Sequence, residues 1–143
     1  MAIRASWAMI AHIDRLFGNH YISMTEDFST KPIIWVGSSK RSFDGFPLDV
    51  KSDFGHALYM AQIDDRHYRS KMMTSLQGVI EIVQAYRGDA FRVVYTVRFA
   101  SAIYVLHVFQ KKSKSGISTP LFEMDLVKRR LRDAEIIEKG RGT

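Results

Sequence analysis

The chain of 143 residues has no cysteine, three prolines and no apolar run long enough to cross a bilayer. Without cysteine there are no disulfides, thiolate zinc sites, iron–sulfur clusters or cysteine nucleophiles, and such a composition is typical of a reducing cytoplasm. His12 and Asp14 interrupt the N-terminal stretch, which argues against a secretory signal. We therefore expect a cytoplasmic protein with no membrane partner.

Several catalytic motifs are also missing. The sequence contains no GxSxG, Walker, HExxH or GxGxxG pattern, so the common hydrolase, nucleotidase and dehydrogenase classes lose support. Asp64, Asp65 and His67 combine carboxylate and imidazole, but their spacing fits no metal motif and loop acidity explains them better. No metal or cofactor is expected.

The charge balance points to an anionic partner. Lys and Arg number 21 against 15 Asp and Glu, giving a net charge of +6 and a pI near 9.7. The charge by itself does not choose among nucleic acid, the ribosome, anionic lipid and an acidic protein. With 46% hydrophobic residues, the chain has the composition of one compact domain.

The chain divides into an N-terminal extension, residues 1–30, and a denser body, residues 31–143. Apolar residues recur at roughly helical spacing in the extension, so it is either helical or disordered. Met24, just before the body, is a candidate translation start.

The body predicts an α+β fold with a mainly antiparallel sheet and a C-terminal helix. Residues 32–37 predict a strand in the sheet interior, and Pro47 opens a helix that ends before Asp64. A loop follows as far as Ser75. Three further strands and a final helix, with Thr119 as its N-cap and Pro120 at its first position, complete the order: residues 79–86, 91–99 and 103–110, then the helix.

One window is free of acidic residues. Between Ala90 and Phe122 there is no Asp or Glu, while five basic residues occur there: Arg92, Arg98, Lys111, Lys112 and Lys114. Strand alternation turns Phe91, Val93, Tyr95, Val97 and Phe99 to the core, and Arg92, Thr96 and Arg98 to the other face. If the basic residues converge, they form a concave positive surface suited to phosphate. The alternative is an exposed polar sheet face with a solvated loop.

His107 allows two interpretations. By alternation it shares a face with Ile103, Val105 and Phe109. It is then either a core histidine with one hydrogen bond or a group that transfers protons.

Several strings resemble the RelE/HigB-like toxins of type II toxin–antitoxin systems, in the phage-derived branch of the RelE/ParE superfamily. They are KPIIWVGSSK, GHALYMAQ, GVIEIV, FRVVYTVRF, VLHVFQKKSKSGISTP and DLVKRRL. The resemblance spans residues 31–139. Its most specific part is the aromatic-Arg-x-x-Tyr strand followed by the basic loop and the helix that begins at TP.

The resemblance implies a RelE-like fold with helices on one face of the sheet. It implies an endoribonuclease (an mRNA interferase) that cleaves mRNA, commonly on the ribosome, and a cognate helix-turn-helix antitoxin in a hetero-oligomer. The family's functional positions fall on Arg92, Lys111 and Lys112, with a looser match at Lys114. Arg98, Thr96 and Lys114 are expected to bind RNA.

Metal-independent cleavage uses the 2′-hydroxyl as nucleophile, so the enzyme must orient the sugar and stabilise charge on phosphorus. Arg92 could clamp the phosphate oxygens while Lys111 or Lys112 protonates the leaving group, and His107 is the nearest histidine for a base. Two alternatives stay open: a ParE-like gyrase inhibitor and a non-catalytic RNA- or ribosome-binding relative. Replacing Arg92 with Ala is expected to abolish cleavage with the fold intact.

Overall fold

The computed structural model describes residues 30–112 and 120–142. Every helix and strand below belongs to the unit Lys31–Thr143. In chain order they are β1 (Ile33–Trp35), α2 (Ser39–Asp44), α3 (Leu48–Gln62), β2 (Lys71–Met72), β3 (Val79–Tyr86), β4 (Asp89–Thr96), β5 (Ile103–Lys112) and α4 (Leu121–Arg141). The predicted extension lies outside the described residues, apart from Thr30.

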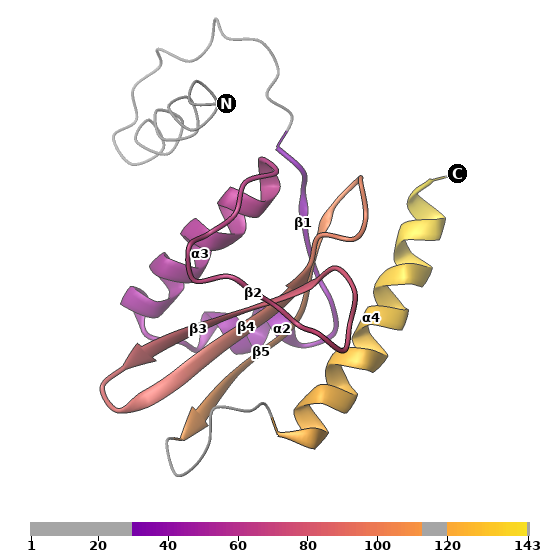
Figure 1. Ribbon diagram of the computed structural model, residues 1–143. Coiled ribbons are helices and arrows are strands. Elements are labelled where there is room, and N and C mark those ends of the chain that lie inside the picture. Colours follow the sequence, from indigo (N-terminus) through magenta and orange to yellow (C-terminus); the bar gives the residue numbers. More distant parts are fainter. Residues whose placement is uncertain (1–29, 113–119, 143) are drawn as a thin grey trace, which may run out of the picture. The chain divides into compact units, whose positions relative to one another are not determined.

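The five strands form one sheet in the order β1-β5-β4-β3-β2 (Figure 1). The pairs β2–β3, β3–β4 and β4–β5 are antiparallel, and only β1 runs parallel to its neighbour β5. The predicted α+β class with a mainly antiparallel sheet is therefore confirmed. The predicted interior position of the first strand is wrong, because β1 is an edge strand.

The tight turn between β3 and β4 fixes the register of these two strands. Arg87 and Gly88 both have positive φ, at 50° and 83°, so they form the two-residue turn that suits twisted strands. Tyr86 pairs with Asp89 beside that turn. The turn was predicted over residues 87–89, but Asp89 already begins β4.

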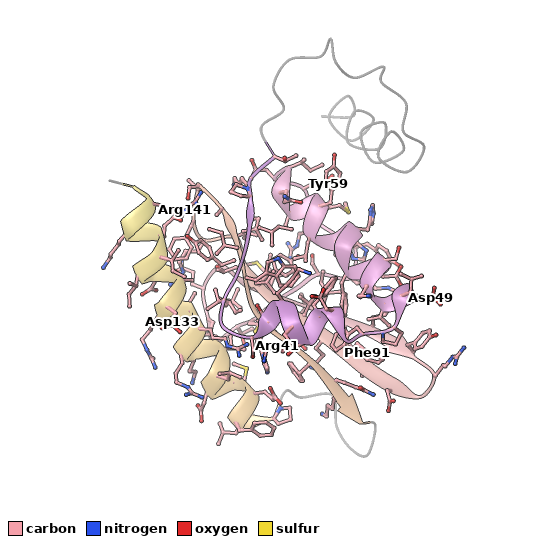
Figure 2. The ribbon with its side chains drawn as sticks, turned by 180° about the vertical axis from the view of Figure 1, so that it is seen from behind. Arg41, Asp49, Tyr59, Phe91, Asp133 and Arg141 are labelled. Carbon is pink, nitrogen blue, oxygen red and sulfur yellow. The ribbon has the colours of Figure 1, made fainter. Side chains whose placement is uncertain are left out.

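Helices cover both faces of the sheet. On one face, α3 buries Phe54, Ala57 and Leu58 against side chains from three central strands: Ile80, Ile82, Phe91, Val93, Tyr95, Ile103, Val105 and Val108. On the other face, α4 buries Val127, Leu131 and Ala134 against a second set: Val79, Val94, Tyr104, Leu106 and Phe109. Figures 1 and 2 show α3 and α4 on opposite sides of the strands. The expectation of helices on one face is wrong, since the central strands are apolar on both faces.

A β-bulge in β5 changes which way His107 faces. Val94 pairs with His107 but Tyr95 pairs with Val105, so β5 has one more residue than β4 at this point. His107 and Phe109 therefore lie on the α4 face, and Ile103 and Val105 on the α3 face. The predicted common face for these four residues is wrong because simple alternation does not anticipate a bulge.

Other boundaries differ for local reasons. β4 ends at Thr96, so Val97 is 36% exposed and Phe99 packs on the α4 face, against prediction. A short helix, α2, and the two-residue β2 were not predicted. Pro120 is itself the N-cap of α4, and Pro47 that of α3. Thr119 lies outside the described residues.

Candidate functional site

The β3–β4 register brings a buried ion pair onto the α4 face of the sheet. Val83 pairs with Arg92, and Glu81 pairs with Val94, so Arg92 and Glu81 are diagonal neighbours on one face. The Arg92 guanidinium forms an ion pair with the Glu81 carboxylate, and the two residues are only 5% and 8% exposed. A pair of charges this deep is costly to desolvate, so its position suggests a role beyond stability.

A cavity of about 320 Å³ opens over this pair. It is lined by Arg69, Lys71, Glu81, Val83 and Arg92. Lys71 pairs with Glu81 across β2 and β3, whereas Arg69 comes from the loop between α3 and β2. The cavity thus contains three cationic groups and one carboxylate, and its net positive charge suits a phosphate.

The end of β5 adds a further cation to this face. Lys111 pairs with Ala90, two residues before Arg92 on β4, which places Lys111 diagonally beside Arg92 on the same face. Lys112 pairs with Asp89 at the same end of the sheet. Lys114 lies outside the described residues. The structure therefore brings Arg92 and Lys111 together, as predicted.

Arg98 and Thr96 lie at the other end of β4. Thr96 is four strand residues beyond Arg92, about 13 Å at the usual rise of a strand, and Arg98 follows two residues after β4 ends. The Arg98 guanidinium donates to the carbonyl of Gln77 at 2.7 Å and 3.1 Å and pairs with Glu135 at 2.8 Å. Thr96 is fully buried and its hydroxyl donates to the Gly78 carbonyl at 2.8 Å. The structure does not bring these two residues to Arg92.

His107 sits in a polar cluster beneath α4. Its Nε2 contacts the Glu123 carboxylate, and Nη1 of Arg130 donates to its Nδ1 at 3.2 Å. Because a guanidinium can only donate, Nδ1 is the acceptor and the proton lies on Nε2, facing Glu123. Burial lowers the pKa of His107, Arg130 lowers it further, and Glu123 opposes both. Both nitrogens of the neutral imidazole are thus engaged, Nε2 by Glu123 and Nδ1 by Arg130.

Arg130 ties this cluster to the start of the chain's body. It also donates to the Leu106 carbonyl at 2.9 Å and to the Ser38 hydroxyl at 2.8 Å. Gly37 has a φ of 57°, and a Cβ there would lie 2.9 Å from Nε of Arg130. Only glycine fits that backbone and leaves room for the guanidinium.

The tyrosines near the basic strand do not reach the cavity. Burial raises the pKa of Tyr95 to about 12, and its ring lies in the α3-side core as alternation predicted. Burial and a 2.6 Å hydrogen bond to Glu138 likewise raise the pKa of Tyr104 to about 12. Neither phenol is placed to accept a proton at this site.

Five contributors were missed by reasoning from sequence: Glu81, Arg69, Lys71, Glu123 and Arg130. Two of them did leave a signal. Arg130 falls on the apolar stripe of α4 between Val127 and Ala134, and Glu81 shares its strand face with Val79 and Val83. A charged residue on an apolar face indicates a buried partner, which here is His107 for Arg130 and Arg92 for Glu81.

The described part of the chain contains neither a metal-binding cluster nor a membrane-spanning helix. Within residues 30–112 and 120–142, no group of three or more His, Asp or Glu side chains could hold a metal ion. Over the same ranges, no helix combines the length and apolarity needed to cross a membrane.

Comparison with known proteins identifies the family. Residues 41–132 match the family described as Phage derived protein Gp49-like (DUF891). No curated protein and no solved structure matches the chain. The matched range contains Arg92, Glu81 and the whole cavity lining. The chain therefore belongs to the phage-derived Gp49-like family, which is related to the RelE/HigB-like toxins of toxin–antitoxin systems.

Proposed function

We propose that residues 31–143 form the toxin of a type II toxin–antitoxin system, an endoribonuclease that cleaves mRNA on the ribosome without a metal. The observation that carries this proposal is the buried Arg92–Glu81 pair in a cavity rimmed by Arg69 and Lys71. Family membership supports the toxin role and an antitoxin partner, which we propose to be a helix-turn-helix protein.

The pair combines a phosphate clamp with a proton acceptor. Arg92 can donate two parallel hydrogen bonds to the non-bridging oxygens, and Arg69 and Lys71 add charge at the cavity rim. Glu81, which forms an ion pair with Arg92, accepts the proton of the 2′-hydroxyl. It supplies the general base that could not be assigned from the sequence.

In the proposed step, the 2′-oxygen forms a bond to phosphorus as the bond to the 5′-oxygen breaks. The 2′-hydroxyl proton passes to Glu81, and the departing 5′-oxygen takes a proton from Lys111 or Lys112. The products are a 2′,3′-cyclic phosphate and a 5′-hydroxyl end. Binding by the ribosome supplies the alignment of the message for in-line attack.

A catalytic role for His107 stays a prediction. Transfer of a proton through this ring requires release of Nε2 from Glu123 or of Nδ1 from Arg130. In the geometry observed, His107 instead stacks on Phe109, with ring centroids 4.9 Å apart, and Phe109 pairs with Arg92 across β4 and β5. We propose that the ring holds Phe109 beside Arg92. RNA binding by Arg98, Thr96 and Lys114 likewise stays a prediction.

Induced expression in a bacterial host tests the proposal. Wild type should arrest growth and create new mRNA 5′ ends within translated messages. Arg92→Lys keeps the charge but loses the planar fork, so arrest and new ends should both decline sharply. Arrest with DNA breaks would favour a ParE-like gyrase inhibitor. Ribosome binding and arrest without new ends would favour a non-catalytic relative, and either result would overturn the nuclease.

A further inference from the structure

An exposed aromatic ring stands beside the cavity. Tyr68 is 81% exposed, although it lies in a loop whose neighbour His67 is only 8% exposed. The Arg69 guanidinium lies over the Tyr68 ring, 5.2 Å from its centroid, and the His67 ring packs against it at 4.6 Å. The ring is thus held on two neighbours while most of its surface faces solvent.

Arg69 links this ring to the cavity. The same side chain lines the cavity with Arg92 and Glu81, lies over Tyr68, and donates to the Gln84 side chain. The ring and the phosphate-binding groups are therefore separated by no more than one arginine side chain. A base and its phosphate are joined through a single ribose, so one nucleotide or two adjacent ones could occupy both places.

The surrounding charges favour an anionic, aromatic ligand. Arg66 and Lys71 flank the segment. Of the carboxylates nearby, Asp64 pairs with Lys31 at 2.6 Å and Asp65 accepts from the Arg66 backbone at 2.7 Å, while Asp53 acts on His67. Single-stranded nucleic acid binds to such combinations of exposed aromatic rings and cations, because every base offers a face for stacking.

We propose that Tyr68 stacks on a base of the single-stranded RNA next to the phosphate held at Arg92, and that Arg69 bridges the two subsites. This inference rests on the proposed function for the identity of its ligand. Tyr68 is a binding residue and takes no part in proton transfer.

The test measures binding of a fluorescent 2′-O-methyl oligoadenylate, whose blocked 2′ positions prevent cleavage, at low salt. A set of such oligomers carries one abasic site at successive positions. Wild type should bind the oligomer with the abasic site at one position about five-fold or more weakly than the intact oligomer. Tyr68→Ala should bind both with equal affinity, and Tyr68→Phe, which keeps the ring, should behave as wild type. Tyr68→Leu, apolar but without a ring, should behave as Tyr68→Ala.

The outcomes separate this inference from the proposed function. If Tyr68→Ala keeps the wild-type ratio, or if wild type does not bind the oligomer, stacking at Tyr68 is overturned. Arg92→Lys in the same titration tests the phosphate contact by itself. If Arg92→Lys binds the intact oligomer more weakly than wild type while Tyr68→Ala keeps the wild-type ratio of intact to abasic affinity, the proposed nuclease stands and the stacking site is overturned. If Arg92→Lys binds as wild type while Tyr68→Ala loses the ratio, the stacking site stands and the phosphate contact at Arg92 is overturned.

Discussion

The face of the sheet covered by α3 presents apolar and aromatic side chains from three strands, whereas the α4 face also holds Glu81, Arg92, Thr96 and His107, all less than 9% exposed. Burial of the first face stabilises the folded state because it removes apolar surface from water. The polar residues buried on the second face form ion pairs and hydrogen bonds across strands and helix, which offset the cost of their desolvation. The contrast assigns stability mainly to the α3 face and chemistry to the α4 face.

Disrupting the core under α3 should cost a large part of the stability with the least specific effect on the site. Phe54 is fully buried, so Phe54→Ala should lower the free energy of unfolding by about 3–5 kcal/mol. Urea unfolding measures this, with Leu48→Ala, at a position 77% exposed on the same helix, as the control expected within about 0.5 kcal/mol. Equal effects at the two positions would contradict the core assignment.

On the α4 face, the ion pair makes stability depend on both partners. Arg92→Ala leaves Glu81 buried without Arg92, so it should lower the free energy of unfolding by about 3–5 kcal/mol. The structure thus revises the expectation that this variant keeps the fold intact. Arg92→Ala combined with Glu81→Ala should recover part of the loss in a double-mutant cycle, without recovering cleavage. Additive losses would show that the pair does not interact.

The neutral His107 predicts a pH dependence of stability. Burial, then Arg130, lower the pKa of His107 despite Glu123, while the unfolded chain keeps a value near 6.5. As the pH falls below 6.5, the unfolded chain takes up a proton before the folded chain does, so the free energy of unfolding falls.

Burial, His56 and Arg69 also lower the pKa of His67, despite Asp53, so the test compares variants. Unfolding at pH 7 and pH 5.5 should show a smaller drop for His107→Gln than for wild type. An identical drop would mean that the pKa of His107 is the same in the folded and the unfolded chain.

The two ends of β4 should differ in how they respond to salt. If Lys111 contacts phosphate, Lys111→Gln should reduce the slope of log affinity against log salt by about one. Arg98→Gln is the matched control, because Gln77 and Glu135 already engage Arg98 at the far end. An unchanged slope for Lys111→Gln would argue against a phosphate contact at Lys111, and an equal change for Arg98→Gln would extend the RNA contact to both ends of β4.

Much of the fold could be predicted from local pattern, because β3, β5 and α3 each carry several apolar residues at strand or helix spacing near their observed bounds. The bulge at Leu106 could not, since it depends on pairing with β4, and it moved His107 to the α4 face. The site was predicted only in part. Arg92 and Lys111 stood out as cations in an acid-free window, but Arg69 and Glu81 join them through strand register and a loop, which sequence spacing does not reveal.

The chemistry of the cut ends tests the Arg92–Glu81 mechanism most directly. Purified protein is added to translating ribosomes, and the new mRNA 5′ ends are assayed for hydroxyl or phosphate. We predict 5′-hydroxyl ends for wild type and a rate about 10²- to 10⁴-fold lower for Glu81→Gln, which keeps the shape of the side chain but accepts no proton. Ends carrying 5′-phosphate, or an undiminished rate for Glu81→Gln, would contradict 2′-hydroxyl attack with Glu81 as the base.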